Sequence, residues 1–300
     1  MNGIVNLLKP PCLSSAQAVS FVKRLTGQKA GHAGTLDPDA CGVLPIMVGK
    51  ATRLFDYLVE KEKTYVTEVS FGVSTDTQDA SGRVISTGDN LPTAERVKAI
   101  LPHFIGRVWQ VPPQFSAIKR DGRALYGSAR SGGFTPVQAR PIDVFSIEYL
   151  HDVPPYGHLL RITCGKGTYI RTICHDIGQA LGCPAHMRML IREQSGPFRI
   201  EEAITMEAFS ALADHGNADG PWLLPIHKAL AHLPQVTFKL SSWKRCINGV
   251  SMGYDKIHPA VQLEVGTVAA GWCDGRLMGI YAVEREGLRV RTLLYEKDAD

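Results

Sequence analysis

The sequence contains no hydrophobic run long enough to cross a membrane and no recognisable export signal. A membrane-spanning helix needs about 20 predominantly apolar residues, and no stretch of this 300-residue chain approaches that length. The first residues, Met1 to Asn6, also lack the basic and apolar segments of a signal peptide. We therefore expect a cytoplasmic protein without a membrane-spanning segment.

Cysteine pairs at redox or metal-binding spacing are missing as well. The chain has 7 cysteines, an odd number, and none of them forms a Cys-x-x-Cys pair. This usage indicates reduced, mostly buried thiols rather than a disulfide framework. Cys174, His175, Cys183 and His186 are residue types that bind zinc, but their spacing matches no common zinc finger or ribbon. Zinc is kept as a minor alternative, and no metal site is predicted.

Internal repeats and low-complexity segments are also absent, and short periodic segments follow one another instead. Apolar residues at helical spacing follow Ser14 and predict a helix that ends near Gly27. A second helix is predicted from about Tyr169 to Leu181. Alternating patterns over residues 64–73 and 158–164 predict strands. Because strands and helices alternate without a regular βαβ rhythm, an α+β fold is predicted rather than a doubly wound sheet.

The composition changes over residues 213–235, where glycine and proline cluster. Residues 236–297 then show short alternating apolar runs separated by glycines, which is typical of a small all-β barrel or sandwich. A unit of about sixty residues is too small to be the main domain but is adequate as an appended module. The sequence therefore predicts two domains, over residues 1–230 and 236–300.

Positive charge is concentrated in one region, although the net charge of the chain is only +4. Residues 101–200 contain 12 Lys and Arg against 6 Asp and Glu, so the other 200 residues sum to −2. Within this region, residues 107–140 contain a single acid, and aromatic residues lie between the cations. Such a composition is typical of a surface for single-stranded or loop RNA. A solvated basic face with core aromatics has the same composition, so both interpretations stay open here. Cations of this segment include Lys119, Arg120, Arg123 and Arg130.

The densest group of reactive side chains is in the segment from Gly31 to Leu44, which combines glycines, one histidine and two carboxylates. Glycines permit tight backbone geometry and close approach of a ligand, and a carboxylate beside them can be a nucleophile or a general base. Taken alone, a structural role is favoured, because Asp37 followed by Pro38 is a common helix start. His32 alone is likewise more often structural than catalytic.

The same segment closely resembles the signature loop of the tRNA pseudouridine-55 synthase family. In that family the aspartate of the Thr-Leu-Asp-Pro run is catalytic; Asp37 matches it, and Asp39 falls at a position that the pattern leaves open. Two departures are visible, since Cys41 replaces the usual threonine and Cys12 the usual glycine. Further matches follow in the family's order: Lys9-Pro10 with Ser14-Ser15, Lys63-Thr64-Tyr65, Thr75-Asp76-Thr77 with Asp79 and Gly82, Gln110 to Lys119, Ala124 to Tyr126, Gly165 to Thr172, Leu190, and Ser195 to Phe198.

The resemblance implies a polar network around the catalytic carboxylate. Arg171 is the expected partner of Asp37, because a neighbouring guanidinium favours the charged form and fixes its orientation. Asp76 is expected to complete this network on the other side of the arginine.

The resemblance also implies which residues contact the flipped uridine. Tyr65 is expected to stack on the base, and Leu190 to provide an apolar wall. His32 is expected to help hold the flipped conformation, and Tyr169 to handle the proton that leaves C5. The basic segment is expected to bind RNA.

The implied activity is isomerisation of uridine to pseudouridine in the T-loop of tRNA, at position 55. A single carboxylate can start it by attacking the sugar, by attacking C6 or by removing a ribose proton, and these routes stay open. Because the reaction involves no redox step, hydrolysis or group donor, no cofactor is expected. The expected partner is the T-arm of tRNA, with no obligate protein partner and a monomeric state.

The implied fold is a mixed-sheet pseudouridine synthase catalytic domain over residues 1–230, with an RNA-binding insertion at about 107–140. A small PUA-like β domain over 236–300 is expected to follow it.

Three alternatives have weaker support. A non-catalytic RNA chaperone would not need Asp37 together with Arg171. A guide-RNA-dependent pseudouridine synthase subunit has a similar loop but typically has charged extensions and depends on partner proteins. A phosphate-binding enzyme that uses Gly165-Lys-Gly-Thr would need the upstream glycine of a P-loop, which is missing.

Overall fold

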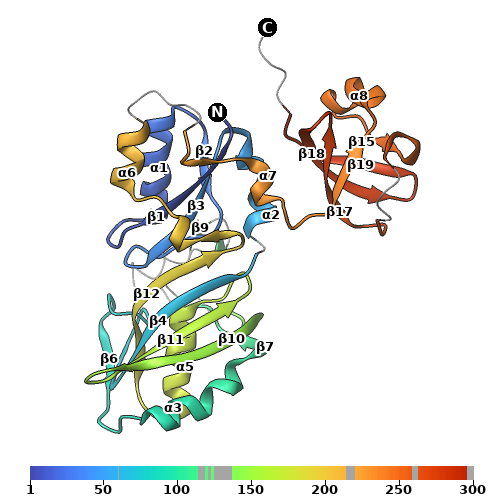
Figure 1. Cartoon of the computed structure of the whole chain (residues 1–300). Coiled ribbons are helices and arrows are strands. Elements are labelled where there is room, and N and C mark those ends of the chain that lie inside the picture. The colour runs from blue at the N-terminus through green and yellow to red at the C-terminus, as the bar shows by residue number, and fades with distance from the viewer. Residues whose placement is uncertain are drawn as a thin grey trace.

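The computed structural model describes residues 1–59, 61–113, 119–120, 123–124, 137–213, 220–258 and 263–295. Most of its strands belong to a ten-stranded and a five-stranded sheet, which lie beside each other (Figure 1). Over these ranges no helix is both long enough and apolar enough to span a membrane. The helices are α1 (Ser15–Thr26), α2 (Phe55–Val59), α3 (Ala94–Ile100), α5 (Ile170–Leu181), α6 (Met206–Ala213), α7 (Ile226–Ala229) and α8 (Trp243–Ile247).

The larger sheet runs in the order β14-β1-β3-β12-β4-β11-β10-β7, with β2 paired to β3 and β13 paired to β12. Along this path β3 and β12 are parallel, and the other neighbours are antiparallel. The predicted α+β fold with a mixed sheet is therefore confirmed. The strands are β1 (Gly3–Lys9), β2 (Ala30–His32), β3 (Cys41–Val48), β4 (Lys63–Phe71), β7 (Gly106–Gln110), β10 (Arg140–Val153), β11 (Gly157–Cys164), β12 (Ala185–Ser195), β13 (Phe198–Arg199) and β14 (Leu223–Leu224).

Helix α1 covers one part of this sheet and forms where its sequence predicts it. The Ser14 side chain accepts a hydrogen bond from the backbone N–H of Gln17 at 3.2 Å, and the Gln17 side chain accepts one from the backbone N–H of Ser14. This capping box fixes the start of the helix. Gly27, in a left-handed conformation with φ of 63°, ends it. α6 packs beside α1, with the rings of Phe21 and Phe209 6.0 Å apart (Figure 1).

Helix α5 covers the other part of the sheet and packs on β12. A Cβ atom on Gly178 would lie 2.5 Å from the Cβ of Ala185, so glycine permits this close packing. The helix starts directly after Tyr169 and ends at Gly182, in agreement with the prediction from the sequence. Its first turn lies at the junction between the two parts of the sheet, where Arg171 reaches the loop between β2 and β3.

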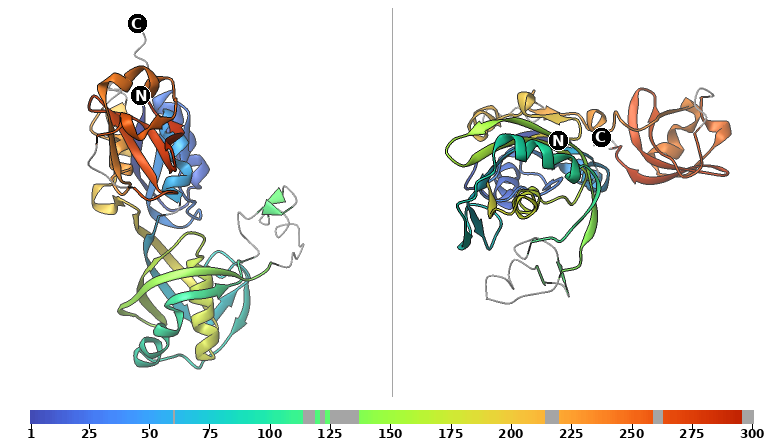
Figure 2. Two further views of the ribbon diagram at one scale, coloured as in Figure 1. Left: turned by 90° about the vertical axis from the view of Figure 1, so that its right-hand side faces the viewer. Right: turned by 90° about the horizontal axis from the view of Figure 1, so that it is seen from below.

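The C-terminal sheet forms a separate body beside the larger one (Figure 2). Its core includes Phe238 and Tyr281, whose rings are 4.8 Å apart. The predicted small β unit is therefore present, and its first strand begins one residue before the predicted start. Its strand order is β15-β17-β18-β19-β16, with β15 (Gln235–Phe238), β16 (Met252–Gly253), β17 (Val268–Cys273), β18 (Arg276–Glu284) and β19 (Gly287–Leu293).

Polar and apolar contacts join the two bodies. The Lys50 ammonium donates a hydrogen bond to the Tyr295 carbonyl at 2.7 Å, and Arg53 donates one to the Leu293 carbonyl at 2.8 Å. One buried apolar cluster includes residues of both bodies, among them Ile4, Met47, Ala270, Ile280 and Leu294.

Candidate active site

Asp37 lies in a tight turn between β2 and β3. The Ala40 N–H donates a hydrogen bond to the Asp37 carbonyl at 3.1 Å, and β3 begins at the next residue, Cys41. In this stretch, which the structure describes throughout, no helix begins at Pro38. The interpretation of Asp37 and Pro38 as a helix start is therefore wrong, because the turn leads directly into a strand.

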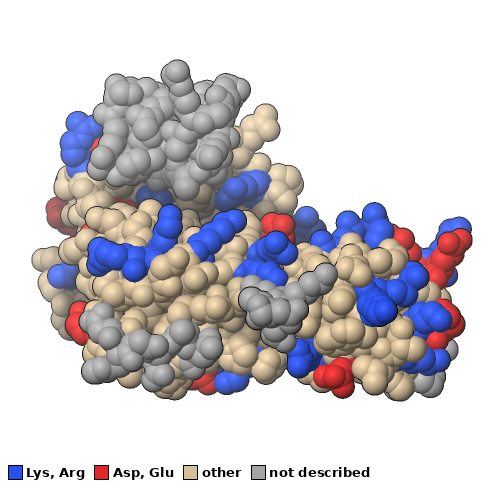
Figure 3. All heavy atoms as spheres, turned by 90° about the horizontal axis from the view of Figure 1, so that it is seen from above, with Lys and Arg blue, Asp and Glu red and all other residues tan. Residues whose placement is uncertain are grey.

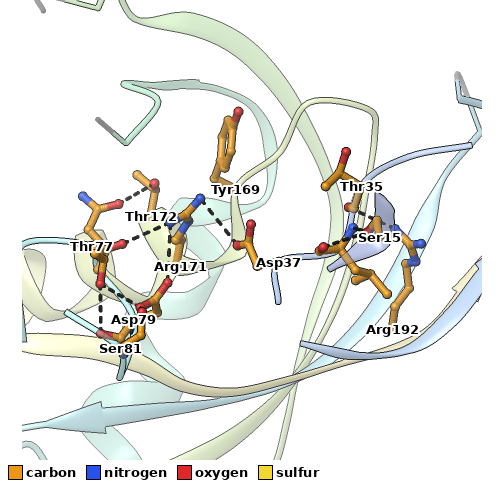
Figure 4. Close-up of polar contacts among 12 residues, drawn as sticks. Ser15, Thr35, Asp37, Thr77, Asp79, Ser81, Tyr169, Arg171, Thr172 and Arg192 are labelled. Atoms are coloured by element: carbon orange, nitrogen blue, oxygen red, sulfur yellow. Dashed lines mark hydrogen bonds and ion pairs between the residues drawn. The ribbon is translucent and has the colours of Figure 1, made fainter. Parts of the chain in front are cut away.

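Arg171 holds two carboxylates that come from different parts of the chain. Its Nη2 is 3.5 Å from Oδ2 of Asp37, and its Nη1 is 3.5 Å from Oδ2 of Asp79. Figure 4 shows the two aspartates on opposite sides of the guanidinium. The Arg171 side chain is 6% exposed and that of Asp79 17%, whereas Asp37 is 38% exposed. Asp37 is thus the member of this network that a ligand can reach.

The surroundings of Asp37 have opposing effects on its charge. Burial raises the pKa of Asp37 above its ordinary value, and the positive charges of Arg171 and Lys9 oppose this shift. The neighbouring carboxylates of Asp79 and Asp39 raise the pKa further. A carboxylate whose charge is only partly compensated is a stronger base and nucleophile than an exposed one.

The second carboxylate on Arg171 is Asp79, so the expectation that named Asp76 is wrong. Asp76 pairs instead with Arg83, with its Oδ2 3.2 Å from Nε. Asp79 is fixed by its own turn, since its Oδ1 accepts hydrogen bonds from the Thr77 hydroxyl at 2.7 Å and the Ser81 hydroxyl at 2.6 Å. The conformation of this turn directs the Asp79 side chain, and not that of Asp76, towards Arg171 at the start of α5. The spacing of the two aspartates in the sequence does not show which of them does so.

A cavity of about 300 Å³ opens beside Asp37. Its walls come from the Asp37 loop, from β4, from β12 and from the segment that leads into α5. Of the seven residues that the sequence predicted for the active site, six line this cavity: His32, Asp37, Tyr65, Tyr169, Arg171 and Leu190. The sheet explains part of this convergence, because β4 and β12 are paired and bring Tyr65 and Leu190 to the same wall.

Arg192 also lines the cavity, although no motif in the sequence points to it. It is fully buried, and its guanidinium donates hydrogen bonds to the carbonyls of Val43 at 2.7 Å, Gly34 at 3.2 Å and Thr35 at 3.5 Å. These carbonyls belong to the loop that carries Asp37 and to the strand that follows it. Burial raises the pKa of Tyr65, and the nearby positive charge of Arg192 opposes this rise. One cation therefore joins β12 to the Asp37 loop and the start of β3.

Lys9 is a second buried cation next to this loop. It is 0% exposed, and its ammonium donates to the carbonyls of Pro38 at 2.9 Å, Leu13 at 2.5 Å and Pro10 at 2.8 Å. The resemblance included the Lys-Pro pair but assigned no role to the lysine. The contact with Pro38 ties the residue after Asp37 to the end of β1.

His32 is half-buried on the cavity wall. Burial and the nearby charge of Arg192 lower the pKa of His32, so its imidazole is neutral near pH 7. Its Nδ1 is buried and has no hydrogen-bond partner among the residues that the structure describes. A neutral ring at this position can contact an uncharged base without adding a second cation beside Arg192.

Two of the four residues weighed as a zinc site, Cys174 and His186, have other contacts. The Cys174 thiol lies 3.7 Å from the Thr67 hydroxyl, and Nδ1 of His186 lies 2.9 Å from the Val73 carbonyl. Across the described ranges, no three His, Cys, Asp or Glu side chains are arranged to hold a metal ion. The minor alternative of a zinc site thus has no support in this part of the chain.

The residues predicted to bind RNA lie in or beside the segment between β7 and β10. The backbone of Lys119, Arg120 and Arg123 belongs to a short hairpin of β8 (Lys119–Arg120) and β9 (Arg123–Ala124), and Arg130 lies outside the described residues. Seen from above, Lys and Arg side chains are spread across both bodies of the molecule (Figure 3).

The chain matches two sequence families. TruB family pseudouridylate synthase (N terminal domain) matches residues 23–170, and tRNA pseudouridylate synthase B C-terminal domain matches residues 171–231. The tRNA pseudouridine synthase B of Pelotomaculum thermopropionicum is 41% identical over 255 residues, which cover 83% of this chain and 80% of that protein. The protein of the same name from Ruegeria pomeroyi is 42% identical over 276 residues, which cover 91% and 89%.

Two solved structures with the same architecture are chains of larger complexes. A chain of an H/ACA RNP bound to a substrate RNA containing 2'-deoxyuridine matches with a TM-score of 0.75 and 26% identity, over 99% of this chain and 86% of that chain. A chain of a Cbf5-Nop10-Gar1 complex matches with a TM-score of 0.73 and 28% identity, over 98% and 84%. With its sequence match to curated relatives over most of its length and this shared fold, the chain belongs to the TruB family of pseudouridylate synthases.

Proposed function

We propose that this chain isomerises a uridine of tRNA to pseudouridine in the T-loop, at position 55, with Asp37 as the catalytic carboxylate. The observation that carries the proposal is the ion pair of Asp37 with Arg171 on the wall of a cavity whose lining includes aromatic, apolar and cationic side chains. The choice of tRNA as the substrate is supported by the relatives named tRNA pseudouridine synthase B, which are 41% and 42% identical to this chain.

The charge of Asp37 is what the reaction requires. Whether the carboxylate attacks C1′, attacks C6 or removes a ribose proton, it acts in its ionised form. Burial raises the pKa of Asp37 and so makes the carboxylate more reactive, while Arg171 keeps the ionised form accessible and orients it. The same network therefore tunes the basicity and the direction of one side chain.

The uridine must leave its stack to reach Asp37, which costs a few kcal/mol. Stacking on an aromatic side chain recovers about 1–3 kcal/mol, and Tyr65 on β4 lines the cavity at the appropriate place. Leu190 lies on the paired strand β12 and provides an apolar wall for the base. These contacts select a flat, uncharged base over a charged group.

The rearrangement is balanced without a co-reactant. The bond between N1 and C1′ breaks, the uracil turns over, and a bond forms between C5 and C1′; C5 then loses a proton and N1 gains one. We assign the removal of the C5 proton to Tyr169, whose ring lies 5.6 Å from the Arg171 guanidinium carbon. Tyr169 lines the same cavity as Asp37, so its phenol oxygen can face the same base.

The proposed chemistry belongs to the larger body, and both bodies are proposed to bind tRNA. The proposed catalytic side chains all come from residues 32–190, within the proposed catalytic domain of residues 1–230. Residues 236–300 contain 9 Lys and Arg against 8 Asp and Glu, so this unit has cations for contact with phosphates although its net charge is small. We propose that this C-terminal unit, together with the 107–140 segment, binds tRNA.

A stand-alone enzyme is favoured over a subunit of a guide-RNA particle. The chain is 41% identical to relatives named tRNA pseudouridine synthase B and 26% identical to the chain of the H/ACA RNP. We therefore propose that the purified monomer acts without a partner protein.

The test uses the purified chain and an unmodified tRNA transcript. We expect pseudouridine at position 55, mapped by chemical sequencing, and its loss in the Asp37→Asn variant with binding affinity changed only a few-fold. The amide of asparagine preserves the shape of the side chain but removes its charge. The matched control is Asp39→Asn, which changes an exposed carboxylate two residues away and should preserve turnover. Substantial isomerase activity in Asp37→Asn would falsify the assignment.

A further inference from the structure

The two strands that flank the proposed RNA-binding segment meet directly beside the active site. β7 ends at Gln110 and β10 begins at Arg140, and these two residues are paired across the antiparallel strands. Both side chains contact the short segment that leads into α5. This segment carries Tyr169 on the cavity wall and is followed by Arg171.

Gln110 is bonded to the backbone of Tyr169 in both directions. Its Nε2 donates a hydrogen bond to the Tyr169 carbonyl at 3.0 Å, and its Oε1 accepts one from the Tyr169 N–H at 2.9 Å. The Gln110 amide thus satisfies both backbone hydrogen-bonding groups of Tyr169, as a neighbouring strand would do in a sheet. Gln110 is 2% exposed, so water does not compete well for these bonds.

Arg140 fixes the same segment from its other side. Its Nη2 donates a hydrogen bond to the Gly167 carbonyl at 2.6 Å, and its guanidinium carbon lies 5.4 Å from the centre of the Tyr169 ring. The guanidinium carbon of Arg171 lies 5.6 Å from that ring. Both distances are within the range of cation–π attraction. Two cations therefore contact the ring of Tyr169, one from β10 and one from α5.

We propose that Gln110 and Arg140 are positioning residues, which hold Tyr169 and the start of α5 in the orientation that the reaction requires. This inference rests on the proposed function. Among the described residues that line the cavity, neither Gln110 nor Arg140 is found, so they act through Tyr169 and not by touching the reacting base. Since Arg171 lies two residues after Tyr169, a displaced segment also moves the partner of Asp37.

The position of this pair in the chain has a functional consequence. Gln110 and Arg140 are the last and first strand residues on either side of the segment that is proposed to bind RNA. A displacement of the paired ends of β7 and β10 would move Tyr169, because Gln110 is hydrogen-bonded to its backbone. The geometry of the active site therefore depends on the same two residues that anchor the RNA-binding segment.

The first test compares single-turnover rates and RNA affinity in Arg140→Met, Arg140→Lys and Gln110→Leu. We expect Arg140→Met and Gln110→Leu to lower the rate about 10- to 100-fold, because a small displacement of a catalytic group has effects of this size. RNA affinity should change only a few-fold. Arg140→Lys should recover part of the rate, since lysine supplies a cation for the ring and a donor for Gly167. The matched control is Arg161→Met, which removes an arginine of β11 that pairs with Glu148 and Glu193.

A double-mutant cycle separates positioning from direct RNA contact. If Arg140 acts through the ring of Tyr169, then Arg140→Met should have little further effect on the rate in a Tyr169→Leu background. Additive effects on the rate, or a loss of affinity accompanied by a flatter salt dependence, would instead show that Arg140 binds a phosphate and would overturn the inference.

A measurement that does not depend on turnover distinguishes failure of this inference from failure of the proposed function. With 3-fluorotyrosine at position 169, the fluorine resonance should shift in Arg140→Met and in Gln110→Leu and stay in place in Arg161→Met. An unchanged resonance in the first two variants counts against the positioning role even if the wild-type enzyme is active. Absence of pseudouridine formation by the wild-type chain, with the resonance shifts present, counts against the proposed function alone.

Discussion

Asp37 and Asp79 both contact Arg171, but their side chains are fixed in different ways. Asp79 uses one carboxylate oxygen to close its own turn and the other to hold the arginine. Asp37 has the more exposed carboxylate and faces the cavity. Asp79 therefore orients the arginine, and Asp37 remains accessible to the substrate.

This division predicts how Asp79→Asn changes the pH dependence of the reaction. The negative charge of Asp79 raises the pKa of Asp37, so its removal lowers that pKa. Because Asp37 must be ionised, the acid limb of the pH–rate profile should move to lower pH. The rate at neutral pH should fall roughly tenfold or more, since Arg171 loses one of its carboxylate contacts and a small misplacement is costly.

The pH profile of single-turnover rates measures this effect. Asp76→Asn is the matched control, because it removes a carboxylate of the same turn that pairs with the exposed Arg83. Its acid limb should coincide with that of the wild type. An acid limb of Asp79→Asn that moves to higher pH would contradict the electrostatic role assigned to Asp79.

The sequence was informative about residues whose neighbours in the chain form a motif. Asp37, Tyr65 and Arg171 were identified because each lies in a short segment that resembles the family pattern, and the structure brings all three to one cavity. The choice between Asp76 and Asp79 failed because it depends on side-chain hydrogen bonds within one turn. Arg192 was missed for a different reason: its partners are 149 to 158 positions away in the chain.

At the scale of elements, helices were predicted better than strand partners. α1 and α5 have local signals, namely a capping box in the first and a terminating glycine in both. The parallel pairing of β3 with β12 has no such signal, since it joins Gly42 to Arg192 across the whole domain. A Cβ atom on Gly42 would lie 2.3 Å from the Arg192 carbonyl oxygen, so this pairing requires glycine.

Arg192 is the side chain that stabilises this arrangement of elements, and Arg192→Met tests it. The substitution leaves buried carbonyls of the Asp37 loop and the strand after it without a donor. Loss of a buried hydrogen-bonded cation costs about 3 kcal/mol of unfolding free energy. Urea unfolding should show this loss. Arg199→Met, at a side chain that is 59% exposed and pairs with the exposed Glu201, should cost about 1 kcal/mol or less. Equal losses in the two variants would mean that Arg192 has no special structural role.

At the scale of the whole molecule, positive charge is the property that extends beyond the active site. The surplus of cations in residues 101–200 suits a polyanion that is larger than one nucleotide. The surplus is evident from composition alone. Composition leaves open whether these cations bind RNA or form a basic surface that contacts only solvent.

Substituting Lys119, Arg120 and Arg123 together by alanine decides between these two interpretations. If they contact phosphates, tRNA binding should weaken, and the slope of log K against log salt should become shallower by about 0.7–0.9 for each lost contact. Binding measured at several salt concentrations gives this slope. The control is the substitution of Lys23, Arg24 and Lys29, three exposed cations of α1 and the turn after it. A slope that is unchanged in the first variant would favour the solvated surface.

Deletion of the chain from residue 236 tests the division of labour between the two bodies. Every residue that lines the described cavity precedes residue 193, so the shortened chain should still modify a minimal T-arm stem-loop under single-turnover conditions. Its affinity for whole tRNA should fall, because 9 lysines and arginines that can contact phosphates are removed. The deletion also removes Ala270, Ile280 and Leu294 from an apolar cluster shared with the larger body, and the carbonyl partners of Lys50 and Arg53. The melting temperature should therefore fall as well. A folded, soluble truncation that cannot modify the stem-loop would show that the C-terminal sheet helps to build the active site, and the proposed division of labour would be wrong.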